Sequence, residues 1–68
     1  MFDPQQALQS LNGRRFAYPN LREELKKIRY EHIQELSPEF DINELLHLAL
    51  RSKWLEETAD GDYIVHVR

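Results

Sequence analysis

The sequence predicts a small α+β domain with three helices, a short strand between the first two helices, and a C-terminal β-hairpin. Three observations support this class. Helix-start signals recur three times, apolar residues after each signal follow a helical spacing, and an Ala59-Asp60-Gly61 turn separates two short extended segments. No repeat, low-complexity tract or linker divides the 68 residues, so we expect one domain over 1–68.

Each predicted helix begins at a short polar residue that is followed three positions later by Glu or Gln. In this capping-box pattern the two side chains satisfy backbone N–H groups that have no partner inside the helix. The three pairs are Asp3 with Gln6, Asn20 with Glu23, and Asp41 with Glu44.

The first helix is expected from Pro4 to Leu11, and it ends where Asn12-Gly13 supplies a residue that accepts the left-handed conformation. In the following segment, 14–19, Phe16 and Tyr18 alternate with Arg15 and Ala17. This period of two predicts a brief strand with both aromatic side chains in the core.

The second helix is expected from Leu21 to Leu36, because apolar residues recur along one face of that segment. The face comprises Leu21, Leu25, Ile28, His32 and Leu36. Ser37-Pro38 should end the helix, since proline disfavours a helical conformation in the residue before it. Phe40 is expected to fill the turn that follows.

The third helix is expected from Ile42 to Ser52, with an apolar side and a polar side. The inward residues are Ile42, Leu45, Leu46, Ala49 and Leu50. The outward residues, which a partner would touch, are Asn43, Glu44, His47 and Arg51.

The hairpin is expected to pair Trp54–Thr58 with Asp62–Val67. A three-residue loop with Gly61 in the left-handed position sets Leu55 opposite Val65. A two-residue Asp60-Gly61 turn would instead set Trp54 opposite Val67. We favour the first register. The direction of the Trp54 side chain depends on which of the two registers occurs.

The order helix, strand, helix, helix, hairpin resembles the winged helix-turn-helix superfamily over nearly the whole chain. The resemblance is one of pattern and identifies no single family. It implies that the third helix enters the major groove of DNA and that the hairpin contacts the phosphate backbone.

The charge distribution argues against that use. Residues 1–40 contain six acidic and six basic side chains, whereas residues 41–68 contain six acidic and only three basic ones, for a net charge of −3. The acidic excess therefore lies in the half of the chain that would approach phosphates, which require Lys and Arg. We predict a non-catalytic binding module that acts through protein–protein contacts, as an adaptor, a regulator or a stand-alone inhibitor.

Exposed aromatic and basic side chains are the expected contacts with a protein. The candidates are Trp54, Tyr30, His47, Arg51, Arg22, Lys26 and Arg29. The alternative is a DNA-binding regulator that uses helix 42–52 for recognition. Its candidates are Asn43, His47 and Arg51 on bases, with Arg14, Arg15, Arg22 and Lys26 on phosphates.

Other chemistry is not expected. The chain has no Cys and only two Gly, so it offers no thiol nucleophile, no thiolate metal site and no glycine-rich phosphate loop. We expect no cofactor, no metal, no catalysis and no small-molecule substrate. The absence of Cys, of a signal-peptide pattern and of an apolar run of about 20 residues predicts a cytoplasmic protein without membrane association.

Overall fold

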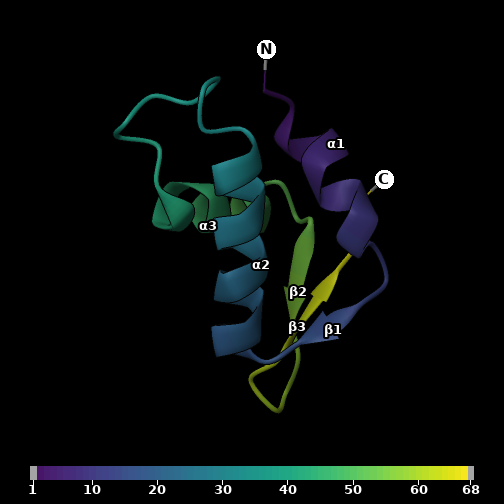
Figure 1. Ribbon diagram of the computed structural model, residues 1–68. Helices are drawn as coiled ribbons and strands as arrows, with labels where there is room; N and C mark the ends of the chain where they lie inside the picture. Colours follow the sequence, from purple (N-terminus) through teal and green to yellow (C-terminus); the bar gives the residue numbers. More distant parts are fainter. Residues whose placement is uncertain (1, 68) are drawn as a thin grey trace.

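The computed structural model describes residues 2–67 and contains three helices and a three-stranded antiparallel sheet (Figure 1). The elements in order are α1 (Pro4–Leu8), the 3₁₀ turn η1 (Gln9–Leu11), β1 (Arg15–Phe16), α2 (Tyr18–Glu31), α3 (Ile42–Arg51), β2 (Leu55–Glu57) and β3 (Tyr63–Val65). The helix α2 stands beside the sheet, and α3 crosses behind α2 (Figure 1). The predicted α+β class is confirmed.

Strand β3 lies at the centre of the sheet, in the order β1-β3-β2. Leu55 pairs with Val65, so the favoured hairpin register is confirmed and the alternative pairing of Trp54 with Val67 is wrong. Gly61 has a φ of 85°, as the three-residue loop requires. The β2–β3 loop and the 32–41 connection lie at opposite ends of the molecule (Figure 1).

Two of the three predicted helix starts are confirmed. The Asp3 side chain accepts hydrogen bonds from the backbone N–H groups of Gln5 and Gln6, at 3.1 and 3.3 Å. The Asp41 side chain accepts one from the N–H of Glu44, at 3.0 Å. Both carboxylates therefore satisfy donors that the first turn of a helix leaves free.

The predicted bounds of the second helix are wrong at both ends. It begins at Tyr18, after Ala17, because Pro19 fits the first turn, where no N–H donor is needed; Asn20 is not the cap. It ends at Glu31, five residues before Leu36. Beyond Ile28 the apolar stripe has little core to pack against, and a helix this short depends on packing.

The core lies between the helices and one face of the sheet, and every buried side chain within residues 2–67 is apolar. Its largest fully buried side chains are Leu8, Leu21, Leu25, Leu45 and Val65. Phe40, Trp54 and Tyr63 are partly buried against this cluster. The predicted core position of Tyr18 is wrong: its side chain is 40% exposed, because Tyr18 opens α2 and does not continue the strand.

The end of α3 contains a residue in an unusual conformation. Lys53 has a φ of 61°, in the left-handed region that glycine normally occupies after a helix. The N–H of Trp54 donates to the carbonyl of Ala49 at 2.9 Å, and the N–H of Lys53 donates to that of Leu50 at 3.1 Å. These two bonds form a Schellman motif, which turns the chain from α3 into β2.

Candidate functional site

The outer side of α3 presents a row of exposed polar residues. Asn43, His47 and Arg51 follow each other at intervals of four, so they form one ridge along the helix. At a rise of about 1.5 Å per residue, the eight steps along the helix from Asn43 to Arg51 span about 12 Å. All three side chains are exposed, as the sequence predicts.

Leu50 lies on this outer side, not in the core. Its side chain is 39% exposed, whereas Leu45 and Ala49 are completely buried. The predicted inward position is therefore wrong, because Leu50 follows Ala49 by about 100° around the helix axis and reaches the boundary of the apolar face. Together with Glu44, His47 and Arg51, Leu50 lines a shallow hollow of about 300 Å³.

Arg22 connects α2 to this surface. Its guanidinium donates to the side-chain oxygen of Asn43 at 3.1 Å and to the hydroxyl of Tyr18 at 3.2 Å, and it lies over the Tyr18 ring. The structure thus brings together Arg22 and Asn43. In the DNA-binding alternative, Arg22 is expected to contact phosphates and Asn43 to contact bases. We call the surface formed by Arg22, Asn43, Glu44, His47, Leu50 and Arg51 the α3 face.

The two arginines before α2 are engaged within the molecule. Arg15 forms ion pairs with Asp62 at 2.9 Å and with Asp60 at 3.1 Å, so it fastens β1 to the hairpin loop. The hydrogen bond that the Arg15 guanidinium donates to Asp62 holds the pKa of Arg15 above its usual value. Arg14 lies over the Phe16 ring, 4.9 Å from its centroid. Neither residue lies with the predicted base contacts on α3.

The remaining basic candidates on α2 also have partners within the chain. Lys26 pairs with Glu23 at 3.4 Å, and Arg29 donates to the backbone carbonyl of Phe40 at 2.9 Å. The second bond fastens the 32–41 connection to α2. Lys26 and Arg29 therefore make contacts within the molecule, and Arg22 is the basic candidate on α2 that belongs to the α3 face.

The two predicted aromatic contacts differ in exposure. Tyr30 is 77% exposed near the end of α2, where it lines a shallow hollow with Ile33, which is 46% exposed. Trp54 is partly buried and packs against the core. Tyr30 is therefore accessible to a partner, whereas the buried part of the Trp54 side chain packs against the core.

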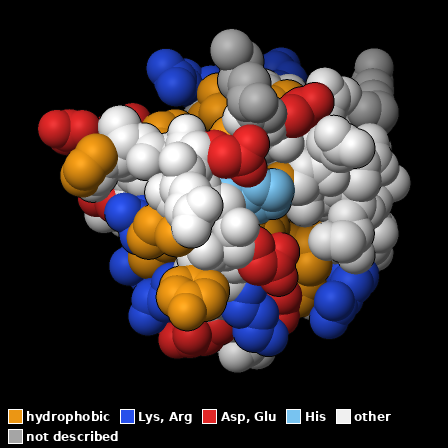
Figure 2. All heavy atoms as spheres, turned by 45° about the horizontal axis from the view of Figure 1, so that its top comes forward, with side chains coloured by type: hydrophobic (Ala, Val, Ile, Leu, Met, Phe, Trp, Pro, Cys, Tyr) orange, Lys and Arg blue, Asp and Glu red, His pale blue; other side chains and the backbone are white. Residues whose placement is uncertain are grey.

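Figure 2 shows the end of the molecule that contains the 32–41 connection. Acidic and basic side chains are mixed there, apolar side chains are exposed among them, and a histidine is recessed near the middle (Figure 2). His32 pairs through Nδ1 with Glu35 at 2.8 Å, and this hydrogen bond lowers the pKa of Glu35. The His32 ring also packs edge-to-face with the Phe2 ring, and the two ring centroids are 4.9 Å apart.

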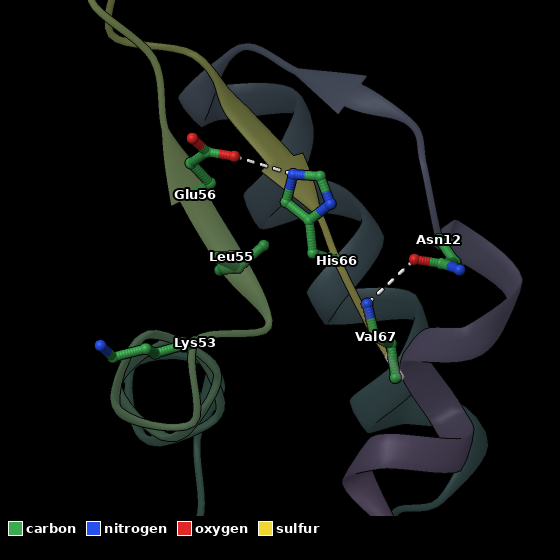
Figure 3. A pocket seen from close by; sticks show the side chains of 6 residues that line it. All are labelled: Asn12, Lys53, Leu55, Glu56, His66 and Val67. Carbon is green, nitrogen blue, oxygen red and sulfur yellow. Dashed lines mark hydrogen bonds and ion pairs between the residues drawn. The ribbon is translucent and has the colours of Figure 1, made fainter.

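A second hollow, of about 620 Å³, lies at the end of the hairpin (Figure 3). Leu55 and Val67 form its apolar floor. His66 and Glu56 point toward one another across the rim and pair at 2.8 Å, while the side chain of Lys53 points away from them (Figure 3). Sequence reasoning missed this pair, which follows from the confirmed register because Glu56 is opposite Ile64, two residues before His66.

The polar groups of this second hollow are mostly satisfied by each other. His66 is paired with Glu56, and the Asn12 side-chain oxygen accepts the N–H of Val67 at 2.9 Å. The α3 face differs, since no ion pair joins its charged side chains to any residue within 2–67. We therefore take the α3 face as the candidate functional site.

Neither a membrane-spanning helix nor a metal-binding cluster occurs in the part of the chain that the structure describes. Within residues 2–67 no helix combines the length and the apolar character needed to cross a membrane. The same residues contain no group of three or more His, Asp or Glu side chains placed to hold a metal ion. Comparison with protein-family models, with curated proteins and with solved structures gives no match.

Proposed function

We propose that this protein is a non-catalytic, winged-helix-like binding domain that engages another protein through the α3 face. The observation that carries this proposal is the exposure of Leu50 between Glu44, His47 and Arg51. An apolar side chain ringed by polar and charged ones is typical of the centre of a protein interface. The short strand β1, which pairs with the hairpin beside three helices, supports the likeness to winged helices.

The energetics agree with a contact of this kind. Covering a leucine that is already partly buried contributes about 1 kcal/mol, since complete burial is worth about 1.5–3 kcal/mol. An arginine beside it adds hydrogen bonds and packing, and arginine is enriched among residues that dominate interface affinity. The α3 face offers both groups within one hollow.

The second candidate function is DNA binding through α3. The exposed ridge of Asn43, His47 and Arg51, with Arg22 at one end, favours it. Three features count against it. Arg15 is held by Asp60 and Asp62, Lys26 is held by Glu23, and Glu44 lies on the same face as the ridge.

Capture and titration test the proposal. Partners captured on immobilised wild-type protein would be purified and titrated against the wild type, Leu50→Glu and the control Gln34→Glu. We expect Leu50→Glu to weaken binding by about tenfold or more, because it places a charge at the centre of the contact, and we expect Gln34→Glu to bind normally. Equal binding by all three would contradict the proposal.

A parallel titration uses duplex DNA at about 50 mM salt, where phosphate contacts are strongest. The proposal predicts no binding that depends on Asn43 or Arg51. Tight binding that weakens steeply with salt and is lost in Arg51→Gln would instead establish the DNA-binding alternative.

A further inference from the structure

We propose that the partner of the α3 face is an acidic protein segment that presents an apolar side chain between two carboxylates. This inference rests on the proposed function and specifies the chemistry of the ligand. It is carried by two arginines of the α3 face that have no acidic partner within residues 2–67, and by the exposed Leu50 beside one of them.

Three basic side chains, Arg15, Lys26 and Lys27, form ion pairs with carboxylates at 2.9–3.4 Å. The other five within residues 2–67 form none: Arg14 lies over the Phe16 ring, Arg29 donates to the Phe40 carbonyl, and Lys53 lines the hairpin hollow. The remaining two, Arg22 and Arg51, both lie on the α3 face. Arg22 donates only to neutral acceptors, the Asn43 amide and the Tyr18 hydroxyl. Both positive charges are therefore available to carboxylates of a partner.

The positions of these charges define a spacing. Arg51 stands at one end of the ridge, and Arg22 reaches the other end through its bond to Asn43. The two ends lie about 12 Å apart along α3, which matches acidic residues seven or eight positions apart on a helical partner, at about 1.5 Å per residue. Leu50 lies beside Arg51, so the apolar side chain of the partner belongs between the carboxylates and next to the one that meets Arg51.

Glu44 sets the orientation of such a segment. It is the one carboxylate lining the hollow around Leu50, and its backbone N–H is bonded to Asp41 independently of its side chain. A carboxylate of the partner close to Glu44 would be repelled. Removing the Glu44 charge should therefore strengthen binding without disturbing the helix cap.

The probe is a short helical peptide with one leucine between two glutamates placed two turns apart. Two comparison peptides replace both glutamates by glutamine or by lysine, and binding is followed by amide chemical shifts of the isotope-labelled protein. We expect the acidic peptide to shift the amides of residues 43–51 and of Arg22. Two exposed ion pairs should make it bind about tenfold more tightly than the glutamine peptide.

Variants of the protein test each charge separately. Arg51→Gln and Arg22→Gln should each weaken binding of the acidic peptide about threefold, and Glu44→Gln should strengthen it by a similar factor. Lys27→Gln is the matched control, since it removes one positive charge that is already paired with Glu24 outside this face. If Arg22→Gln disturbs the structure, the tighter binding of the acidic peptide that is expected of Glu44→Gln still tests the inference.

The outcomes separate this inference from the proposed function. Equal affinity for the acidic and the glutamine peptides, or no shift with the acidic peptide at about millimolar concentration, would overturn the inference. The proposed function would still stand if a captured protein partner depended on Leu50. Duplex DNA that shifts the same amides and competes with the peptide would overturn both.

Discussion

The side-chain oxygen of Asn12 accepts a hydrogen bond from the backbone N–H of Val67, at 2.9 Å, across 55 residues of sequence. Beside it, the N–H of Gly13 donates to the carbonyl of Val65 at 2.7 Å. Together these bonds hold the extended end of β3 against the corner between η1 and β1. Val67 is consequently buried, although it lies beyond the last paired residue of the strand.

Replacing Asn12 by alanine should destabilise the fold by about 1–2 kcal/mol, because the Val67 N–H would lose its acceptor. Urea unfolding followed by circular dichroism measures the change. Ser10→Ala, at an exposed position in η1, is the control and should be nearly neutral. If both variants unfolded at the same urea concentration, the Asn12 bond would contribute nothing to stability.

Lys53→Gly should stabilise the protein by about 1 kcal/mol. The residue has a φ of 61°, and the left-handed conformation costs a side-chain-bearing residue about 1–2 kcal/mol that glycine avoids. Thermal unfolding of Lys53→Gly and of Ser52→Gly compares the two positions directly. Ser52 has an ordinary φ of −84°, so glycine there should lower the stability; a gain at Ser52, or a loss at Lys53, would contradict the assigned motif.

Leu45→Ala and Leu50→Ala should differ strongly in stability. Leu45 is completely buried, so its truncation should cost about 2–5 kcal/mol, whereas Leu50 is 39% exposed and should cost about 1 kcal/mol or less. Denaturant titration of both variants gives the two values. A loss at Leu50 as large as that at Leu45 would mean that Leu50 points into the core and would remove it from the α3 face.

Glu35 should titrate below the usual range of a glutamate, because its hydrogen bond with His32 lowers its pKa. A carboxylate whose pKa is lowered by folding stabilises the native state above the unfolded value of about 4.3. That stabilisation is lost as the pH falls through the lower, folded value. Carbon NMR of the Glu35 carboxyl in wild type and His32→Ala checks this, and an unchanged pKa in the variant would exclude His32 as the cause.

The sequence was sufficient to predict the features that depend on local chemistry. A carboxylate just before a helix forms the caps at Asp3 and Asp41, and the left-handed position of the hairpin turn favours a glycine, which is Gly61. The caps and the turn could therefore be recognised from a few neighbouring residues. The same turn fixed the register of Leu55 with Val65. The outward ridge on α3 followed from helical spacing.

The errors occurred where distant residues decide the outcome. The end of α2 depends on how far the core extends and on the bond from Arg29 to the Phe40 carbonyl, which no local pattern indicates. The exposure of Leu50 depends on the angle at which α3 packs, and the pairing of Arg15 with the hairpin loop spans 45 residues or more. Periodicity identifies the two sides of a helix, but it leaves the residues at the boundary undecided.

The central position of β3 has a consequence for how the protein acquires its structure. Because β3 comes after both of its neighbours along the sequence, neither β1 nor β2 has a pairing partner until the last part of the sheet has been synthesised. Pairing of Arg15 with Ile64 closes a loop of most of the chain, and such closures are slow relative to helix formation. During translation the nascent helices must therefore remain without their sheet, and native structure should appear abruptly once residues 63–67 have left the ribosome.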